Sequence, residues 1–217
     1  MTIALIPVKK LEESKSRLLS SLPSETRQAL TLAMLEDLIE ALSASRGITR
    51  IAVTTPDSTV AERAKAAGAE IIMRPEPGLN AALEDGVNCL ALDKGEDILF
   101  VLGDVAGALA EDFDQLLREA SEETRGIWLA PSSDGGTSAL LHRPAGVVPC
   151  CFGKDSAARH REAAAEAAVK YHETPLLSLA IDLDQPEDLE AFLATKGGGR
   201  RTRALLTSAG LTPMKNA

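Results

Sequence analysis

Three cations stand close together just after the first apolar segment of the chain. Residues 3–8 have the composition of a buried strand, and the loop that follows carries Lys9, Lys15 and Arg17. Open α/β sheets bind their ligands at the carboxyl ends of their strands. Cations gathered at that edge suit a polyanion such as a nucleoside triphosphate. The alternative is a solvated basic loop, which is the usual fate of a run of charges.

Two acidic groups follow or end other predicted strands. Asp104 comes after the apolar run at residues 98–102, and a carboxylate in this place is suited to a divalent cation. Asp182 and Asp184 are two residues apart, so they lie on the same side of an extended segment. One of them could face Asp104 across a shared site. The structural alternatives are a turn role for Asp104 and a helix N-cap role for Asp184.

Three short segments combine glycine with polar residues. Residues 78–83 place a glycine and Asn80 before a helix, where backbone N–H groups favour anions or polar rings. Residues 134–138 contain two glycines and two hydroxyls that could wrap an oxyanion. Residues 152–156 lead into another helix and could present N–H groups to a second anion. A hairpin turn and plain helix caps are the structural alternatives.

The histidines and cysteines are less informative. His142, His160 and His172 have no nucleophile to pair with, so we expect structural roles, although His160 lies near the second anion loop. There are 3 cysteines, two of them adjacent, which indicates neither a disulfide framework nor a zinc site. We expect reduced thiols in a cytoplasmic protein.

The elements that position these residues alternate along the chain, as in α/β proteins. We expect strands at residues 3–8, 48–54, 69–73, 98–102, 127–130, 137–142 and 179–183. We expect helices at residues 24–43, from 57 or 58 to 68, from about 80, and at 111–122, 155–172 and from 186, with a loop at 74–78. The strand at 137–142 makes an antiparallel excursion after a tight turn. These patterns predict a Rossmann-like three-layer sandwich with a mostly parallel sheet, and 98–102 is expected to be the central strand.

Composition sets further limits. The 217 residues fit a single domain, which we place at residues 1–196, with 197–217 as a basic C-terminal tail. We expect this tail to be solvated, and a contact within a homodimer is the alternative. The net charge of −9 argues against a nucleic-acid partner. The sequence shows neither an apolar stretch long enough for a membrane span nor a secretory signal, so we expect no membrane association.

Taken together, these segments resemble the guanylyltransferases of deazaflavin coenzyme F-420 biosynthesis, which belong to the MobA-like nucleotidyltransferases. The matching stretches occur in the family's order: residues 6–9 with 15–18, 78–83, 103–104, 134–141, 152–153 with 156–160, and 182–189. The resemblance implies a fold of the nucleotide-diphospho-sugar transferase type. It also implies transfer of GMP from GTP to 2-phospholactate, phosphoenolpyruvate or 3-phosphoglycerate, with release of pyrophosphate.

The resemblance further implies a role for each matched residue. The GTP phosphates would be held by the catalytic cations Lys9, Lys15 and Arg17. The phosphate of the acceptor would be held by Thr137, Gly153 and Ser156. A Mg²⁺ cofactor would be bound by the catalytic Asp104 with Asp182 or Asp184. The nucleoside pocket would be lined by Gly78, Leu79, Asn80 and Ala81.

One stretch departs from the family pattern, and two other functions stay open. The family follows its metal-binding Asp with Leu or Val and then Pro, whereas Val105 is followed here by Ala106 and Gly107. We expect this small-residue loop to be more mobile. The alternatives are another MobA-like nucleotidyltransferase, using CTP or a molybdopterin or sugar-phosphate acceptor, and an inactive nucleotide-binding module.

Overall fold

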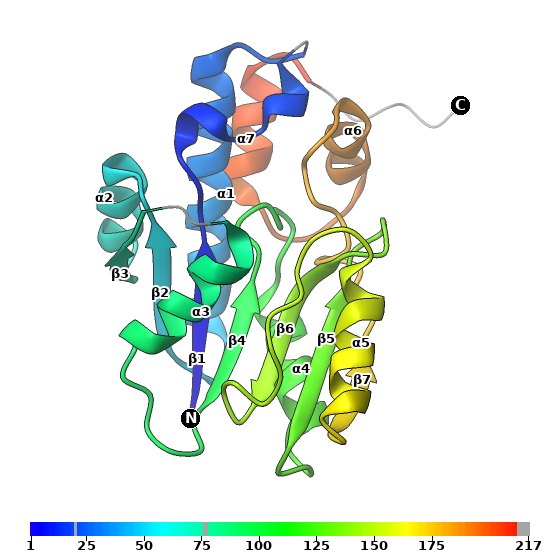
Figure 1. Ribbon diagram of the computed structural model, residues 1–217. Coiled ribbons are helices and arrows are strands. Elements are labelled where there is room, and N and C mark those ends of the chain that lie inside the picture. The colour runs from blue at the N-terminus through cyan, green and yellow to red at the C-terminus, as the bar shows by residue number, and fades with distance from the viewer. Residues whose placement is uncertain (20, 76–77, 212–217) are drawn as a thin grey trace.

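Seven strands form one sheet in the computed structural model, which describes residues 1–19, 21–75 and 78–211. The strands are β1 (Thr2–Pro7), β2 (Ile48–Thr55), β3 (Glu70–Met73), β4 (Asp97–Val101), β5 (Gly126–Pro131), β6 (Thr137–Arg143) and β7 (Lys170–Glu173). Their order across the sheet is β3-β2-β1-β4-β6-β5-β7 (Figure 1). Strand β6 runs antiparallel to both of its neighbours, and the other pairings are parallel. The central strand and the antiparallel excursion are therefore those predicted.

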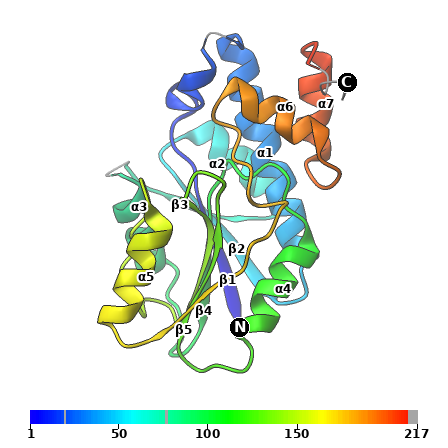
Figure 2. The same ribbon diagram turned by 90° about the vertical axis from the view of Figure 1, so that its right-hand side faces the viewer.

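Helices cover both faces of this sheet. The α-helices are α1 (Ser24–Ala44), α2 (Ser58–Ala66), α3 (Leu79–Cys89), α4 (Ala110–Ala120), α5 (Ser156–Glu166), α6 (Pro186–Ala194) and α7 (Arg200–Ser208). Two short 3₁₀ helices, η1 (Leu11–Glu13) and η2 (Ser16–Leu18), lie between β1 and α1. Helices α3 and α5 lie on one face, and α1, α2 and α4 lie on the other (Figure 2). The three-layer prediction is thus confirmed. None of the described helices has the length and apolarity needed to cross a membrane.

Strand β1 shows how the sequence builds the two main cores. Side chains alternate between the faces of a strand. Ala4 and Ile6 accordingly pack in the core with α1, α2 and α4, whereas Ile3 and Leu5 pack in the core with α3 and α5. All four are fully buried, and burying a large aliphatic side chain stabilises the fold by about 1.5–3 kcal/mol. A strand apolar on both faces is typical of the interior of a parallel sheet.

A third core lies above the sheet and joins segments that are far apart in the chain. It contains Leu18 from the Lys15 loop, Met34 from α1 and Ala106 from the loop after β4. It also contains Leu183, which lies between Asp182 and Asp184, and Leu206 from α7, together with Leu189 and Phe192 from α6. The loops that carry the candidate site are therefore packed against one shared cluster.

Two predicted elements are wrong. The helix predicted at residues 155–172 ends at Glu166, and residues 170–173 form β7 at the sheet edge. After the end of the helix, Ala168 has a φ of 51°, a conformation that is usually adopted by glycine, so no glycine marks the stop in the sequence. The strand predicted at 179–183 is reduced to a single bridge between Val105 and Asp182. Its apolar residues Leu179 and Leu183 bury their side chains in two different cores instead of joining the sheet.

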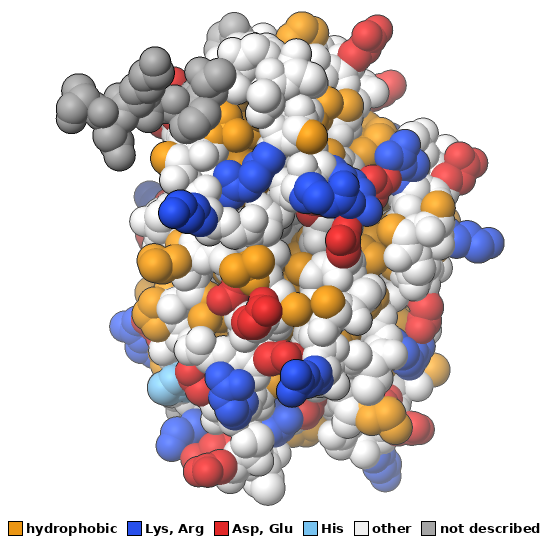
Figure 3. All heavy atoms as spheres, turned by 180° about the vertical axis from the view of Figure 1, so that it is seen from behind, with side chains coloured by type: hydrophobic (Ala, Val, Ile, Leu, Met, Phe, Trp, Pro, Cys, Tyr) orange, Lys and Arg blue, Asp and Glu red, His pale blue; other side chains and the backbone are white. Residues whose placement is uncertain are grey.

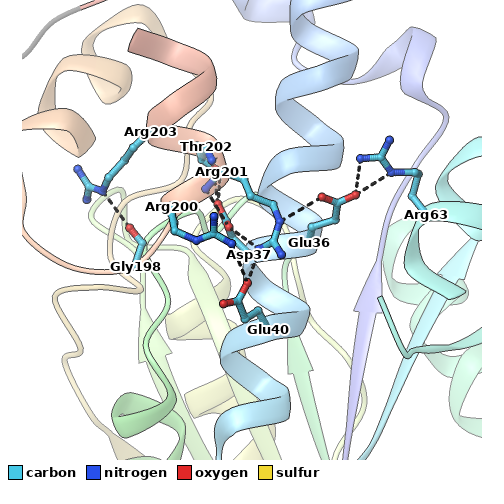
Figure 4. A network of polar contacts seen from close by, with 9 residues as sticks. All are labelled: Glu36, Asp37, Glu40, Arg63, Gly198, Arg200, Arg201, Thr202 and Arg203. Carbon is cyan, nitrogen blue, oxygen red and sulfur yellow. Dashed lines mark hydrogen bonds and ion pairs between the residues drawn. The ribbon is translucent and has the colours of Figure 1, made fainter. Parts of the chain in front are cut away.

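The C-terminal segment is not a solvated tail. Residues 200–208 form α7, whose N-terminus is bound by Asp37 of α1 (Figure 4). The Asp37 carboxylate accepts from Arg201 N at 3.1 Å, from Thr202 N at 2.8 Å and from the Thr202 hydroxyl at 2.9 Å. The Arg201 guanidinium also pairs with Asp37 and Glu40. On the face shown in Figure 3, basic side chains are interspersed with acidic and hydrophobic ones. Residues 212–217 of the predicted tail and 76–77 of the predicted loop lie outside the described residues.

The glycines before α7 pack on the loop that follows Asp104. A Cβ atom at Gly198 would collide with the carbonyl oxygen of Ala108, and one at Gly199 would collide with that of Ala106. Ala106 and Ala108 are buried. Because Gly198 and Gly199 have no Cβ atom, their backbone can approach the backbone of residues 106–108 closely. This packing argues against the mobility that we expected for the loop.

Candidate active site

A cavity of about 300 Å³ opens at the carboxyl ends of β1, β2 and β4. Its wall takes residues from the ends of all three strands and from the start of α3, among them Lys9, Thr55, Leu79 and Asp104. Ligand pockets in proteins typically measure about 300–1,000 Å³. The cavity lies at the sheet edge where open α/β proteins bind their ligands, which is where the sequence placed the first cations.

Three carboxylates meet beside this cavity. Asp104 follows β4, and Asp182 and Asp184 lie in the irregular segment before α6. One carboxylate oxygen from each residue lies within 4.8 Å of the other two. An antiparallel bridge between Val105 and Asp182 and a hydrogen bond of 3.4 Å from Leu183 N to Asp104 O join the two segments. The structure thus brings the two acidic groups face to face.

The ammonium of Lys15 lies between two of these carboxylates. Its Nζ atom is 2.8 Å from Asp184 Oδ1 and 3.4 Å from Asp104 Oδ2, and its side chain is 6% exposed. Burial acts to lower the pKa of Lys15, but the two carboxylates outweigh it and hold the pKa above its ordinary value. Lys15 is therefore charged at neutral pH. Its backbone has a φ of 52°, which is uncommon outside glycine and typical of strained functional loops.

The carboxylates fit a magnesium ion. Mg²⁺ takes oxygen ligands, combining one or two carboxylates with phosphate oxygens and water. Oδ1 of Asp104 is buried and has no hydrogen-bond partner in the described part of the chain. Burial and then the charge of Asp104 raise the pKa of Asp182 to about 6. A divalent cation among these oxygens would satisfy the unpaired Asp104 atom and relieve the repulsion between the carboxylates.

Asp184 does not cap α6. The N-cap residue is Gln185, and the Asp188 carboxylate accepts from the backbone N–H groups of Asp184 and Gln185 at 3.0 and 2.6 Å. The alternative structural role for Asp184 is therefore wrong. Burial acts to raise the pKa of Asp184, but the charge of Lys15 outweighs it and lowers that pKa. The side chain is thus an ionised carboxylate facing the site.

Two side chains outside the first loop hold the backbone around Lys15. The guanidinium of buried Arg27 on α1 donates to Ser14 O at 3.0 Å. Asp57, the N-cap residue of α2, also accepts from Leu11 N at 3.0 Å. Neither contact was predicted, because an arginine within a helix and a capping Asp carry no sequence signal for a distant loop.

The other two cations of this loop lie further out. Lys9 is exposed and forms part of the cavity wall. The side chain of Arg17 is 71% exposed, and its Nη1 atom is 3.9 Å from Asp184 Oδ2. An exposed ion pair of this length is weak. Both side chains can therefore reorient toward an anion that enters the cavity.

The turn at residues 134–136 is a hairpin turn between β5 and β6. Asp134 Oδ1 accepts from Gly136 N at 2.9 Å, and Ser132 N donates to Gly136 O at 3.2 Å. The N–H groups of Gly135 and Gly136 are therefore used within the turn, which leaves the hydroxyls of the segment as its groups for an oxyanion. Because β6 runs antiparallel to β4, the turn brings Thr137 to the edge where Asp104 follows β4.

A second polar group forms where β6 and α5 begin. The hydroxyls of Thr137 and Ser156 are buried and lie 2.9 Å apart. Gly153 has a φ of 120° and Asp155 a φ of 53°, and these two residues turn the chain into α5. Among the described residues, no hydrogen bond uses the backbone N–H groups of residues 153–155. Free N–H groups at the start of a helix favour an anion.

Asn80 connects the cavity to this second group. Its Nδ2 donates to Phe152 O at 3.1 Å, and its Oδ1 accepts from Phe152 N at 2.8 Å. Gly78 and Leu79 line the cavity, whereas Asn80 and Ala81 do not. Asn80 instead fastens the loop before α5 to the start of α3.

The family model and the curated relatives that match this chain all describe guanylyl transferases. The family model described as "Guanylyl transferase CofC like" matches residues 2–216. A phosphoenolpyruvate guanylyltransferase from Sphaerobacter thermophilus is 38% identical over 191 residues, covering 87% of this chain and 91% of the relative. A 3-phospho-D-glycerate guanylyltransferase from Phenylobacterium zucineum is 36% identical over 212 residues, covering 95% of this chain and 96% of the relative.

Solved structures share the fold at low sequence identity. A protein from Desulfovibrio desulfuricans G20, described as a nucleotide-diphospho-sugar transferase, has a TM-score of 0.78 at 18% identity and covers 96% of this chain and 95% of its own. CMP:2-keto-3-deoxy-manno-octonic acid synthetase in complex with CTP has a TM-score of 0.64 at 14% identity, and the match covers 96% of this chain and 99% of the synthetase chain. These likenesses confirm the predicted type of fold.

Proposed function

Because this chain belongs to the family of CofC-like guanylyl transferases, we propose that it transfers GMP from GTP to a small phosphorylated three-carbon acid and releases pyrophosphate. We place this reaction in the biosynthesis of coenzyme F-420, as the sequence resemblance implies. The observation that carries the proposal is the meeting of Asp104, Asp182 and Asp184 beside the cavity, with Lys15 paired to Asp104 and Asp184. Curated relatives named for phosphoenolpyruvate and for 3-phospho-D-glycerate support the class of acceptor.

The chemistry is an in-line displacement at phosphorus. An oxygen of the acceptor's phosphate forms a bond to the α-phosphorus of GTP, the bond to the β-phosphate oxygen breaks, and the electron pair leaves with pyrophosphate. An ionised phosphate needs no general base, which agrees with a site built from carboxylates and cations rather than from a histidine and a nucleophile. Positioning and charge neutralisation then supply the catalysis.

The carboxylates and cations divide this work. Asp104, with Asp182 and Asp184, would hold Mg²⁺. A bound Mg²⁺ acts as a Lewis acid on phosphate oxygens and as a template for both substrates. Lys9 and Arg17 reach the triphosphate from the exposed side of the cavity. The Lys15 ammonium, fixed at 2.8 Å from Asp184 Oδ1, neutralises charge at the point where the carboxylates and the phosphates approach.

The acceptor binds at the second polar group. The free N–H groups of residues 153–155 and the hydroxyl pair of Thr137 and Ser156 receive its phosphate. Gly153 adopts a φ of 120°, which a residue with a Cβ rarely tolerates, so the bend that exposes these N–H groups depends on glycine. Asn80 holds this loop against the start of α3, where Gly78 and Leu79 face the nucleotide.

A pyrophosphate-release assay tests the proposal. Each of GTP, ATP, CTP and UTP is offered with Mg²⁺ and with 2-phospholactate, phosphoenolpyruvate or 3-phosphoglycerate, and mass spectrometry identifies the product. We expect release with GTP and one of the acids, and none without an acceptor. Turnover with CTP but not GTP would favour the alternative nucleotidyltransferase. Binding of GTP without turnover on any acid would favour the inactive module.

A further inference from the structure

His160 on α5 is fully buried and forms polar contacts through both ring nitrogens. Cys151 N lies 3.0 Å from Nε2, and Thr137 Oγ1 lies 3.3 Å from Nδ1. The edge of the ring also packs on Phe152, with centroids 5.0 Å apart and an interplanar angle of 76°. The imidazole is therefore fixed between the loop before α5 and the first residue of β6.

These partners determine which nitrogen carries the proton. A backbone N–H can only donate, so the bond from Cys151 requires a lone pair on Nε2 of His160. The proton of the neutral ring then resides on Nδ1, next to Thr137 Oγ1 and to the backbone carbonyl of Ser156. Burial, with the nearby Arg159 charge, lowers the pKa of His160 to about 4, so the ring is neutral at pH 7.

The tautomer decides what the hydroxyl pair can do. Thr137 and Ser156 share two hydroxyl protons, and one of them forms the bond of 2.9 Å between the two oxygens. Because Nδ1 carries a proton and cannot accept another, the second hydroxyl proton is not used on the imidazole. In the other tautomer, Nδ1 would accept that proton and the pair would have no donor left. No further acceptor for it occurs among the described residues, and both side chains are at most 2% exposed.

A buried hydroxyl proton without an acceptor is costly, and an anionic oxygen is its strongest partner. We propose that His160 is a positioning residue of the acceptor site: its Nδ1–H makes the Thr137–Ser156 pair a hydrogen-bond donor to the phosphate of the acceptor. This inference rests on the proposed function. It adds a residue that contacts no substrate and acts through the polarity of the two hydroxyls that do.

The tautomer is measurable without turnover. The chain has 3 histidines, so two-dimensional NMR of the ring nitrogens gives a simple spectrum, in which the His160→Asn variant assigns the signal of His160. We expect a protonated Nδ1 and an unprotonated Nε2 at pH 7.5. A proton on Nε2, or on both nitrogens, would overturn the proposal.

Two substitutions separate the donor from the rest of the ring. Asn places an amide N–H where Nδ1 stands, so His160→Asn keeps a donor for Thr137. Gln places its amide where Nε2 stands, so His160→Gln keeps a partner for Cys151 and removes that donor. Hydrogen bonds to charged groups correspond to about 10- to 100-fold in affinity. We expect His160→Gln to raise the KM of the acceptor by this factor with an unchanged KM for GTP, and His160→Asn to restore most of the loss.

His172→Asn on the half-exposed edge strand is the matched control and should leave both KM values unchanged. Equal effects of the two His160 variants on the acceptor, or a change in the KM of GTP as large as that of the acceptor, would overturn the role of His160. A wild-type protein that transfers GMP to none of the acids would instead overturn the proposed function. The two failures are therefore distinguishable.

Discussion

Replacing Asp37 should detach α7 from the domain. The Asp37 carboxylate is 4% exposed and accepts from two backbone N–H groups, one hydroxyl and one guanidinium (Figure 4). In Asp37→Ala the buried N–H and hydroxyl of Thr202 lose their acceptor in a place that water does not reach, since Thr202 is 0% exposed. Each unsatisfied buried donor costs about 1–3 kcal/mol. The Arg201 side chain is 35% exposed and can be rehydrated, so its share is small.

The expected loss in the free energy of unfolding is about 2–6 kcal/mol for Asp37→Ala, because two buried donors of Thr202 lose their acceptor. At this chain length it corresponds to a Tm lower by about 4–24 °C. Asp37→Asn keeps one acceptor oxygen and should lose about half as much. Because Leu206 of α7 packs in the same core as Leu183 and Ala106, the variants should also lose turnover in parallel with stability.

Urea unfolding and calorimetry measure the loss. The matched control is Glu40→Ala, which removes a partner of Arg201 that is 56% exposed and should change stability by less than about 0.5 kcal/mol. An Asp37→Ala variant within 0.5 kcal/mol of the wild type, about the size of a surface effect, would refute the reasoning that α7 is anchored by this carboxylate.

Three further predictions concern pH and the site. Burial lowers the pKa of His142 from 6.5 to about 3 in the folded state. The unfolded state therefore takes up the proton first as pH falls, so the protein keeps its full stability above pH 6.5 and loses stability between pH 6.5 and about 3. The raised pKa of Asp182 changes stability in the opposite direction, so the effect of His142 is isolated by comparing the wild type with His142→Phe. Between pH 7 and pH 5, the free energy of unfolding measured in urea should fall by about 2 kcal/mol less in His142→Phe than in the wild type. Equal losses in the two proteins would contradict this prediction. Asp104→Asn should lower turnover about 10²–10³-fold with an unchanged urea midpoint, and wild-type turnover would remove it from the catalytic group. Thr137→Val should raise the KM of the acceptor more than that of GTP in steady-state kinetics, and equal changes would move Thr137 out of the acceptor site.

Local patterns in the sequence were sufficient for six of the seven strands in the described sheet and for the main parts of the site. Apolar runs marked the buried strands, and Lys9 and Asp104, which follow two of these runs, marked the sheet edge at which the cavity opens. The parallel arrangement then brought these strand ends together. Residue type and position relative to a strand were enough, because both are properties of short segments.

What the sequence did not reveal depends on tertiary contacts. Strand β7 is short and half-exposed, and it follows an alanine-rich helix that stops without glycine. Residues 200–208 carry basic side chains typical of a solvated end, and only the carboxylate of Asp37 on a distant helix shows why they fold against α1. The role of His160 likewise follows from its partners Cys151 and Thr137, which local spacing does not specify.

The central claim is that carboxylates from two separate segments hold one divalent cation. Electron paramagnetic resonance of bound Mn²⁺, which takes the same oxygen ligands as Mg²⁺, tests it most directly. We predict one bound ion per chain in the wild type and strongly weakened binding in both Asp104→Asn and Asp184→Asn. Binding of wild-type strength in either variant would contradict the account.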